Sequence, residues 1–62
     1  MRITYYYYVW YNGEIIAKRQ RLVDALDFIQ EHNYNDEEKK HLQLTNSFGE
    51  SFDTFTGATL DQ

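Results

Sequence analysis

The first third of the chain has the hydrophobic pattern of a β-hairpin. Residues 5–11 (YYYYVWY) are aromatic or β-branched at every position, and such side chains fit a pleated strand. Asn12-Gly13 separates this run from Glu14 and the apolar residues 15–17, and an Asn-Gly pair in that setting is typical of a two-residue hairpin turn. We predict strands over roughly residues 3–11 and 14–20.

Two helices are predicted in the middle of the chain. Leu22, Ala25, Leu26 and Ile29 recur at the spacing of one helix face, and Asn33 is suited to end that helix. The segment that follows is a helix start, with Asn35 as the cap and an acidic first turn whose third residue is Glu38. We therefore expect a second, short helix over residues 36–40.

The C-terminal third has a weaker pattern. Leu42, Leu44 and Phe48 alternate with polar residues, as in a half-buried strand, and Gly49 marks a turn. Residues 51–56 fit a short edge strand, although Phe48, Phe52 and Phe55 also have a helical spacing. Residues 57–62 are expected to be a flexible tail.

These elements predict an α+β fold in a single domain of residues 1–62, of which about 1–56 are ordered. The order is β-β-α-(short α)-β(-β), with a three- to four-stranded antiparallel sheet packed on one helix. A right-handed crossover places the third strand beside the first, which makes the most apolar strand central.

A two-residue turn pairs Tyr11 with Glu14 and Val9 with Ile16, and this register predicts which face of the hairpin is buried. The face with Glu14 and Lys18 suits water. Tyr6, Tyr8, Trp10, Ile15 and Ala17 are therefore expected to pack on the helix. The residues predicted to face outward, as a partner-binding surface, are Tyr5, Tyr7, Val9, Tyr11 and Ile16. A longer turn would exchange the two faces. On this assignment, Tyr7→Ala and Val9→Asp should keep the fold and abolish association.

Size and charge narrow the classes of function. The chain has 62 residues and no cysteine, so disulfides cannot supplement a small core, and association with a partner is the common alternative. A net charge of −4 disfavours binding to nucleic acid or to anionic membranes. No apolar run has the roughly 18 residues of a membrane span, and the N-terminus has no leader pattern, so we expect a cytoplasmic protein.

The sequence offers no catalytic constellation. His32 and His41 match no compact metal-ligand spacing, and Ser47 and Ser51 have no assured His or Asp partner. We therefore expect a protein that is not an enzyme, with no metal, cofactor or small-molecule substrate.

Acidic residues form the remaining candidate surface. Asp24, Asp27 and Glu31 recur along one side of the first helix. Such a row is typical of the solvated face of an amphipathic helix, and it also fits a mimic of DNA phosphates. The residues of this acidic surface are Asp24, Asp27, Glu31, Asp36, Glu37 and Glu38.

The order hairpin–helix–strand, with the small size and the acidity, is similar to that of small phage-encoded inhibitor proteins. Among these are inhibitors of uracil-DNA glycosylase, which imitate DNA with carboxylates. The similarity covers the topology of about two-thirds of the chain and no diagnostic residue, so it implies an inhibitor only at the level of architecture.

Three functions follow as expectations. The first is a protein-binding module that associates with itself or inhibits a larger host protein through the aromatic face. The second is an acidic DNA mimic that inhibits a DNA-processing enzyme. The third is a single-stranded nucleic-acid binder that stacks bases on tyrosine, and the negative net charge disfavours it.

Overall fold

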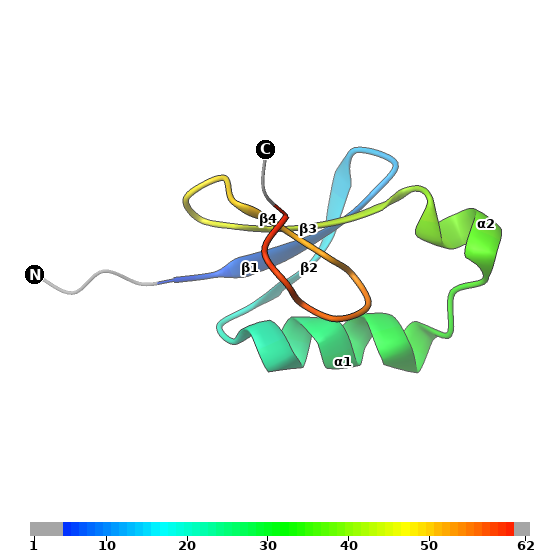
Figure 1. Cartoon of the computed structure of the whole chain (residues 1–62), viewed down its shortest axis with the longest axis horizontal. Helices are drawn as coiled ribbons and strands as arrows, with labels where there is room; N and C mark the ends of the chain where they lie inside the picture. The colour runs from blue at the N-terminus through cyan, green and yellow to red at the C-terminus, as the bar shows by residue number, and fades with distance from the viewer. Residues whose placement is uncertain (1–4, 61–62) are drawn as a thin grey trace, which may run out of the picture.

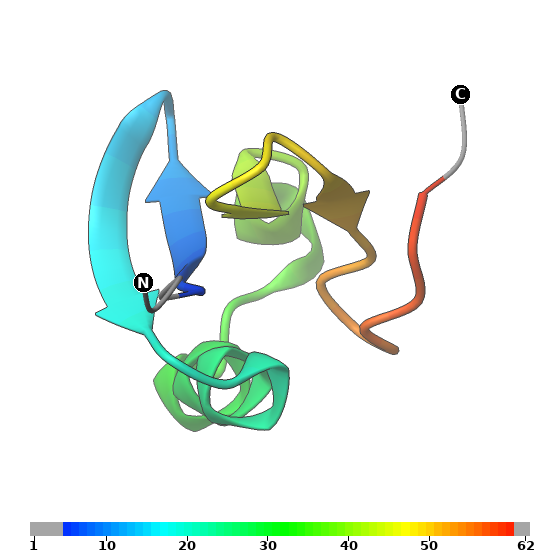
Figure 2. The ribbon, with the colours of Figure 1, turned by 90° about the vertical axis from the view of Figure 1, so that its left-hand side faces the viewer.

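The computed structural model describes residues 5–60 and confirms the α+β fold. Four antiparallel strands form one sheet in the order β2-β1-β3-β4, and α1 packs on one of its faces (Figures 1 and 2). The elements are β1 (Tyr7–Tyr11), β2 (Glu14–Arg19), α1 (Leu22–His32), α2 (Asp36–Lys39), β3 (Leu42–Asn46) and β4 (Ser51–Phe52). Residues 3 and 4 of the predicted first strand, and residues 61 and 62 of the predicted tail, lie outside the described part of the chain.

The β1–β2 hairpin has the predicted turn but contains a β-bulge that the sequence did not reveal. Tyr11 pairs with Glu14 and Trp10 with Ile15, as expected, whereas Val9 pairs with Ala17 instead of Ile16. Ile16 is the extra residue, and an extra residue reverses the alternation of all side chains beyond it. The predicted division of the hairpin into faces is therefore wrong for most of its residues.

The core lies between α1 and the odd-numbered side of β1. Val9 and Leu44 are fully buried and are directly opposite each other on β1 and β3. Ala17 and Ala25 are buried in the same cluster, and their small side chains let α1 approach the sheet closely. The buried hydrophobic residues are Val9, Ala17, Ala25, Ile29, Leu42 and Leu44.

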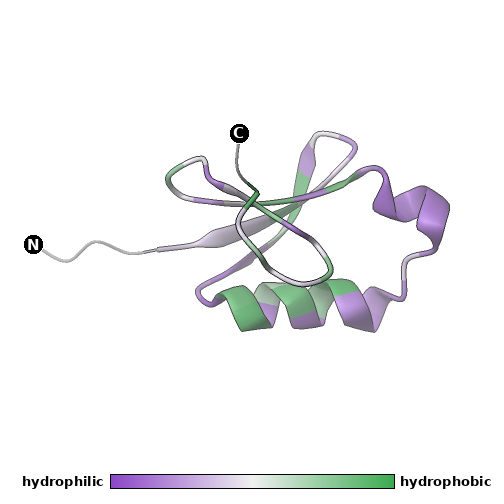
Figure 3. Cartoon of the chain, viewed as in Figure 1, coloured by the Kyte–Doolittle hydropathy of each residue, from purple (hydrophilic) through white to green (hydrophobic). Residues whose placement is uncertain are grey.

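The two helices end and begin as the sequence indicates. α1 has no side-chain cap at Arg21, and it stops at Asn33, which adopts the left-handed conformation with φ 55°. α2 is hydrophilic along its length (Figure 3) and begins with a capping box between Asn35 and Glu38. A four-residue helix with no buried residue depends on that cap, because it has no apolar face to pack.

The C-terminal segment returns to the structure instead of fraying. Residues 51 and 52 form β4, and Phe52 makes a β-bridge with Thr59, while the Leu60 N–H donates to the Ser51 carbonyl at 2.9 Å. Residues 53–58 turn back toward α1 (Figure 1). Gly57 lies against the side chains of Leu22 and Leu26. This segment covers the β4 edge of the sheet, so the expectation of a flexible tail is wrong for residues 57–60.

Candidate protein-binding surface

The sheet has one covered face and one face that neither helix covers (Figure 2). Tyr7 and Tyr11 pack on the core beside Val9, so the alternating side chains of Tyr8 and Trp10 project from the opposite side. We call this uncovered side of the sheet the open face. Two of its residues are in β1, four are their partners across the ladders, and Tyr6 lies just before β1 and contacts Tyr8 and Lys18. The open-face residues are Tyr6, Tyr8, Trp10, Ile15, Lys18, Gln43 and Thr45.

Short-range contacts hold the open-face side chains in place. The Tyr6 and Tyr8 rings have centroids 6.5 Å apart, and Lys18 Nζ lies 4.5 Å from the Tyr6 ring centroid. Trp10 Nε1 donates to Thr45 Oγ1 at 2.9 Å. The indole donor is therefore satisfied inside the chain, and the ring presents apolar area to any partner. Side chains that are already ordered lose little entropy when they bind.

The charge of the open face differs from that of the whole molecule. Lys18 is its only charged side chain among the strand residues that the structure describes, because Glu14 pairs with Tyr11 on the α1 side. Asp24, Asp27 and Glu31 are exposed on α1, which packs on the other face. These three carboxylates of α1 thus lie away from the open face.

The predicted partner-binding residues are not brought together. Val9 is fully buried, and Tyr7 and Tyr11 pack on the core, where Tyr7 meets Phe52 with ring centroids 5.6 Å apart. Tyr5 and Ile16 are exposed, as expected. The bulge at Ile16 explains why Val9, Tyr7 and Tyr11 face the core. It places Ala17, instead of Ile16, beside Val9 on the α1 side.

The residues expected to face α1 are corrected in the same way. Ala17 is buried as predicted, but Trp10 pairs with Ile15 on the open face, and Ile15 is 51% exposed. Tyr6 and Tyr8 are half-buried on that face and do not belong to the core. The sequence therefore identified an aromatic strand with one surplus face and chose the wrong face.

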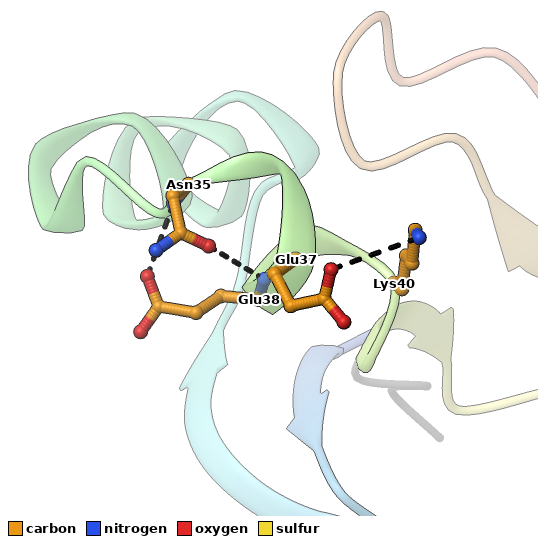
Figure 4. A network of polar contacts seen from close by, with 4 residues as sticks. All are labelled: Asn35, Glu37, Glu38 and Lys40. Atoms are coloured by element: carbon orange, nitrogen blue, oxygen red, sulfur yellow. Dashed lines mark hydrogen bonds and ion pairs between the residues drawn. The ribbon is translucent and has the colours of Figure 1, made fainter.

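The predicted acidic surface is divided between two helices. Asp24, Asp27 and Glu31 are all exposed along α1. In α2, Glu38 Oε1 accepts from the Asn35 N–H at 3.0 Å, and Asn35 Oδ1 accepts from the Glu38 N–H at 2.8 Å (Figure 4). The Glu38 carboxylate is thus engaged in the cap. Glu37 forms an exposed ion pair of 3.8 Å with Lys40, which contributes little stability.

The two histidines take part in aromatic packing. His32 stacks on Tyr34 with ring centroids 5.5 Å apart, and the Phe28 ring packs against it in a tilted arrangement at 4.2 Å. His41 lies edge-on to Tyr11 at 6.1 Å, and Tyr11 stacks on Tyr34 at 5.9 Å. In residues 5–60, no three His, Cys, Asp or Glu side chains gather as metal ligands would.

A groove of about 270 Å³ lies between α1, α2 and the C-terminal segment, and no sequence pattern predicts it. Its lining includes Ile29, Tyr34, Lys39 and Phe55. Burial raises the pKa of the Tyr34 hydroxyl above its usual range, with smaller contributions from the charge of Glu38 and from Tyr11. A raised pKa disfavours the phenolate, so this hydroxyl is not activated as a nucleophile.

Comparison of the chain with protein-family models, with curated proteins and with solved structures gave no match. Among the described residues, neither helix has the length and apolar composition needed to cross a bilayer.

Proposed function

We propose that this chain is a non-enzymatic protein-binding module of the cytoplasm, which binds a larger protein through the open face and also associates with itself. The observation that carries the proposal is the stripe of Tyr8 and Trp10 on β1, with Tyr6 just before that strand, on the side of the sheet away from α1. The lack of cysteine suits a reducing compartment. Inhibition of the bound protein is the natural outcome for so small a partner.

The composition of the open face favours a protein as its ligand. Tyrosine and tryptophan are enriched in the centres of protein interfaces, because they bring large apolar area with few rotatable bonds. The open face adds the exposed Ile15 and a single cation, Lys18, and it has hydroxyl and amide groups at Thr45 and Gln43. A partner that fits this face offers apolar side chains with a carboxylate positioned for Lys18.

The test is affinity capture from a cell lysate, with mass spectrometry of the retained proteins. Three immobilised proteins are compared: wild type, Tyr8→Ala and Val23→Ala. Val23 is 54% exposed on α1 and serves as a control for loss of apolar surface elsewhere. A protein retained by wild type and by Val23→Ala, but lost from Tyr8→Ala, supports the proposal. Retention of the same proteins by all three, or of none, contradicts it.

Single-stranded nucleic acid is a second candidate ligand, and one observation favours it. The open face combines aromatic rings with Lys18, and its strand residues carry no carboxylate. Bases stack on such rings with little regard to sequence. Titration of the Trp10 fluorescence with oligothymidylate at low salt tests this candidate. A saturable quench in wild type that disappears in Tyr8→Ala supports it, and an unchanged signal excludes it.

A further inference from the structure

Among residues 5–60, no strand pairs with the outer edge of β2, whereas the C-terminal segment covers the β4 edge. β2 contains no proline, and its central residues Ile15 and Ile16 are 51% and 39% exposed. Exposed apolar residues on a free edge strand favour pairing with another strand. We propose that a second copy of this chain pairs antiparallel with β2, with Ile15 opposite the partner's Lys18, so that the two sheets become one. This inference rests on the self-association in the proposed function.

The direction of the backbone groups supports this register. The Asn12 N–H donates to the His41 carbonyl at 3.2 Å, and the Ser47 N–H donates to the Tyr6 carbonyl at 3.0 Å, so even-numbered residues along β1 face β3. Backbone groups alternate along a strand, and the odd-numbered residues of β1 therefore face β2. Their partners in β2 are Glu14, Ala17 and Arg19. Ile15 and Lys18 are left to direct their N–H and C=O groups to the free edge.

A side-chain contact agrees with this direction. Arg19 Nη1 donates to the Lys18 carbonyl at 2.9 Å. This bond occupies one lone pair of a carbonyl that the strand alternation directs to the β2 edge. A backbone N–H of the second copy replaces or joins this donor when the strands pair.

The bulge selects a second copy over an ordinary strand. A regular strand presents outward-facing groups at every second residue, whereas the bulge separates Ile15 from Lys18 by two residues. Another β2 strand has the same spacing. In the antiparallel arrangement, Ile15 meets the partner's Lys18 and Lys18 meets the partner's Ile15. Both pairs are satisfied together about a two-fold axis between Ile16 and Ala17.

The charges of β2 are complementary in the same register. Glu14 lies at the beginning of the strand and Arg19 at its end. Antiparallel pairing puts Glu14 opposite the partner's Arg19, and both side chains are on the α1 side of their sheets. Parallel pairing would instead oppose like charges, which is destabilising.

Charge exchange tests the proposal. The variants are Glu14→Lys, Arg19→Glu and the double variant, with Glu31→Lys on exposed α1 as a control for the same charge change. Sedimentation velocity over a range of concentrations measures the dimer, and circular dichroism checks that each variant is folded. We expect each single variant to weaken dimerisation about tenfold, because each alters two cross-strand pairs per dimer. The double variant should restore wild-type dimerisation, and Glu31→Lys should leave it unchanged.

A monomer at all concentrations overturns the proposal, as does a dimer that the charge variants leave unaffected. If Tyr8→Ala abolishes the dimer while Glu14→Lys preserves it, self-association occurs through the open face instead of β2. Partner capture by Tyr8→Ala is a separate measurement from dimerisation. The two experiments therefore distinguish a wrong β2 pairing from a wrong assignment of the open face as the partner-binding surface. Slower amide exchange at Ile15 and Lys18 with rising concentration would independently support the register.

Discussion

Val9 decides which side of the hairpin is buried. It is fully buried opposite Leu44, and Ala17 lies on its other side in the sheet. Within the described residues, Val9 is the only large apolar side chain that the hairpin contributes to the buried core. The other five core residues are the small Ala17 and residues of α1 and β3. A polar group introduced here has no hydrogen-bond partner and no route to water.

Val9→Asp should therefore unfold the protein, which reverses the expectation from the sequence. An unpaired buried charge costs about 3–5 kcal/mol, as much as the whole stability of many chains of this size. Tyr8→Asp places the same group on the open face and should remain folded. Thermal melting followed by circular dichroism distinguishes the two variants. A cooperative transition in Val9→Asp would show that the core is assigned incorrectly.

Gly57 and Gly49 offer a matched pair of substitutions. Both have positive φ, 79° and 82°, where an L-residue costs about 1–2 kcal/mol. A Cβ at Gly49 would meet nothing within 4 Å, whereas one at Gly57 would come within 2.8 Å of Leu26 Cδ1. Gly57→Ala should therefore lower the free energy of unfolding more than Gly49→Ala does, as measured by urea denaturation. Equal losses would mean that the C-terminal segment does not rest on α1.

At the scale of elements, the capping box and the hairpin turn can be predicted from neighbouring residues, whereas the β-bulge cannot. The α2 capping box needs only Asn35 and Glu38, three residues apart, and it forms as predicted. The hairpin turn likewise needs only Asn12-Gly13, and both residues have positive φ. No residue pattern near Ile16 predicts the bulge. The bulge is stabilised by a tertiary contact, the packing of Ala17 in the core.

The turn after β4 should respond to acid. Asp53 Oδ1 accepts from the N–H groups of Phe55 and Thr56 at 2.7 and 3.1 Å, and these bonds lower the pKa of the carboxyl below its ordinary value of 3.8. Its contribution to stability is therefore present above that ordinary value and is lost as the pH falls through the lowered one. The amide chemical shifts of Phe55 and Thr56 should move together in this acidic range.

Asp53→Asn is the control for this titration. The amide oxygen of Asn can accept the same bonds but does not ionise in this range. The shifts of both amides should then be independent of pH, and a persisting acid transition would point to another carboxylate.

At the scale of the whole molecule, the C-terminal segment completes the structure. It supplies Thr59 to the β4 edge and brings Gly57 against Leu22 and Leu26. A chain of this length buries only about 60% of its unfolded surface, so each such cover has a large share of the stability. Charge is also distributed unevenly over the molecule. Acidic residues are exposed on α1, and Lys18 lies on the opposite side of the sheet.

Ending the chain after Phe52 should destabilise it by about 1.5–3 kcal/mol, the cost of exposing one large apolar side chain. Leu22 and Leu26 are already half-buried, so their combined further exposure is about that of one side chain, and β4 loses its neighbour. The midpoint of urea denaturation measures the effect. An unchanged midpoint would contradict the packing of residues 53–60 on the rest of the fold.

The sequence by itself determined the hairpin, the two helices, the third strand and the antiparallel sheet on one helix, and it left residues 51–56 open between a strand and a helix. Periodicity, caps and the Asn-Gly turn are interactions among residues close in the chain, so they can be read from the chain. It also determined that the aromatic first strand has more apolar surface than one face can use.

Only the tertiary structure decided which face of the aromatic first strand is buried and which is the open face. The choice depends on Leu44 of β3 lying opposite Val9, and on the room that Ala17 and Ala25 leave for α1. These contacts join distant segments, and a single extra residue in β2 satisfies them at no visible cost to the local pattern. The free β2 edge and the covered β4 edge arise in the same way, because edges exist only once the strands are assembled.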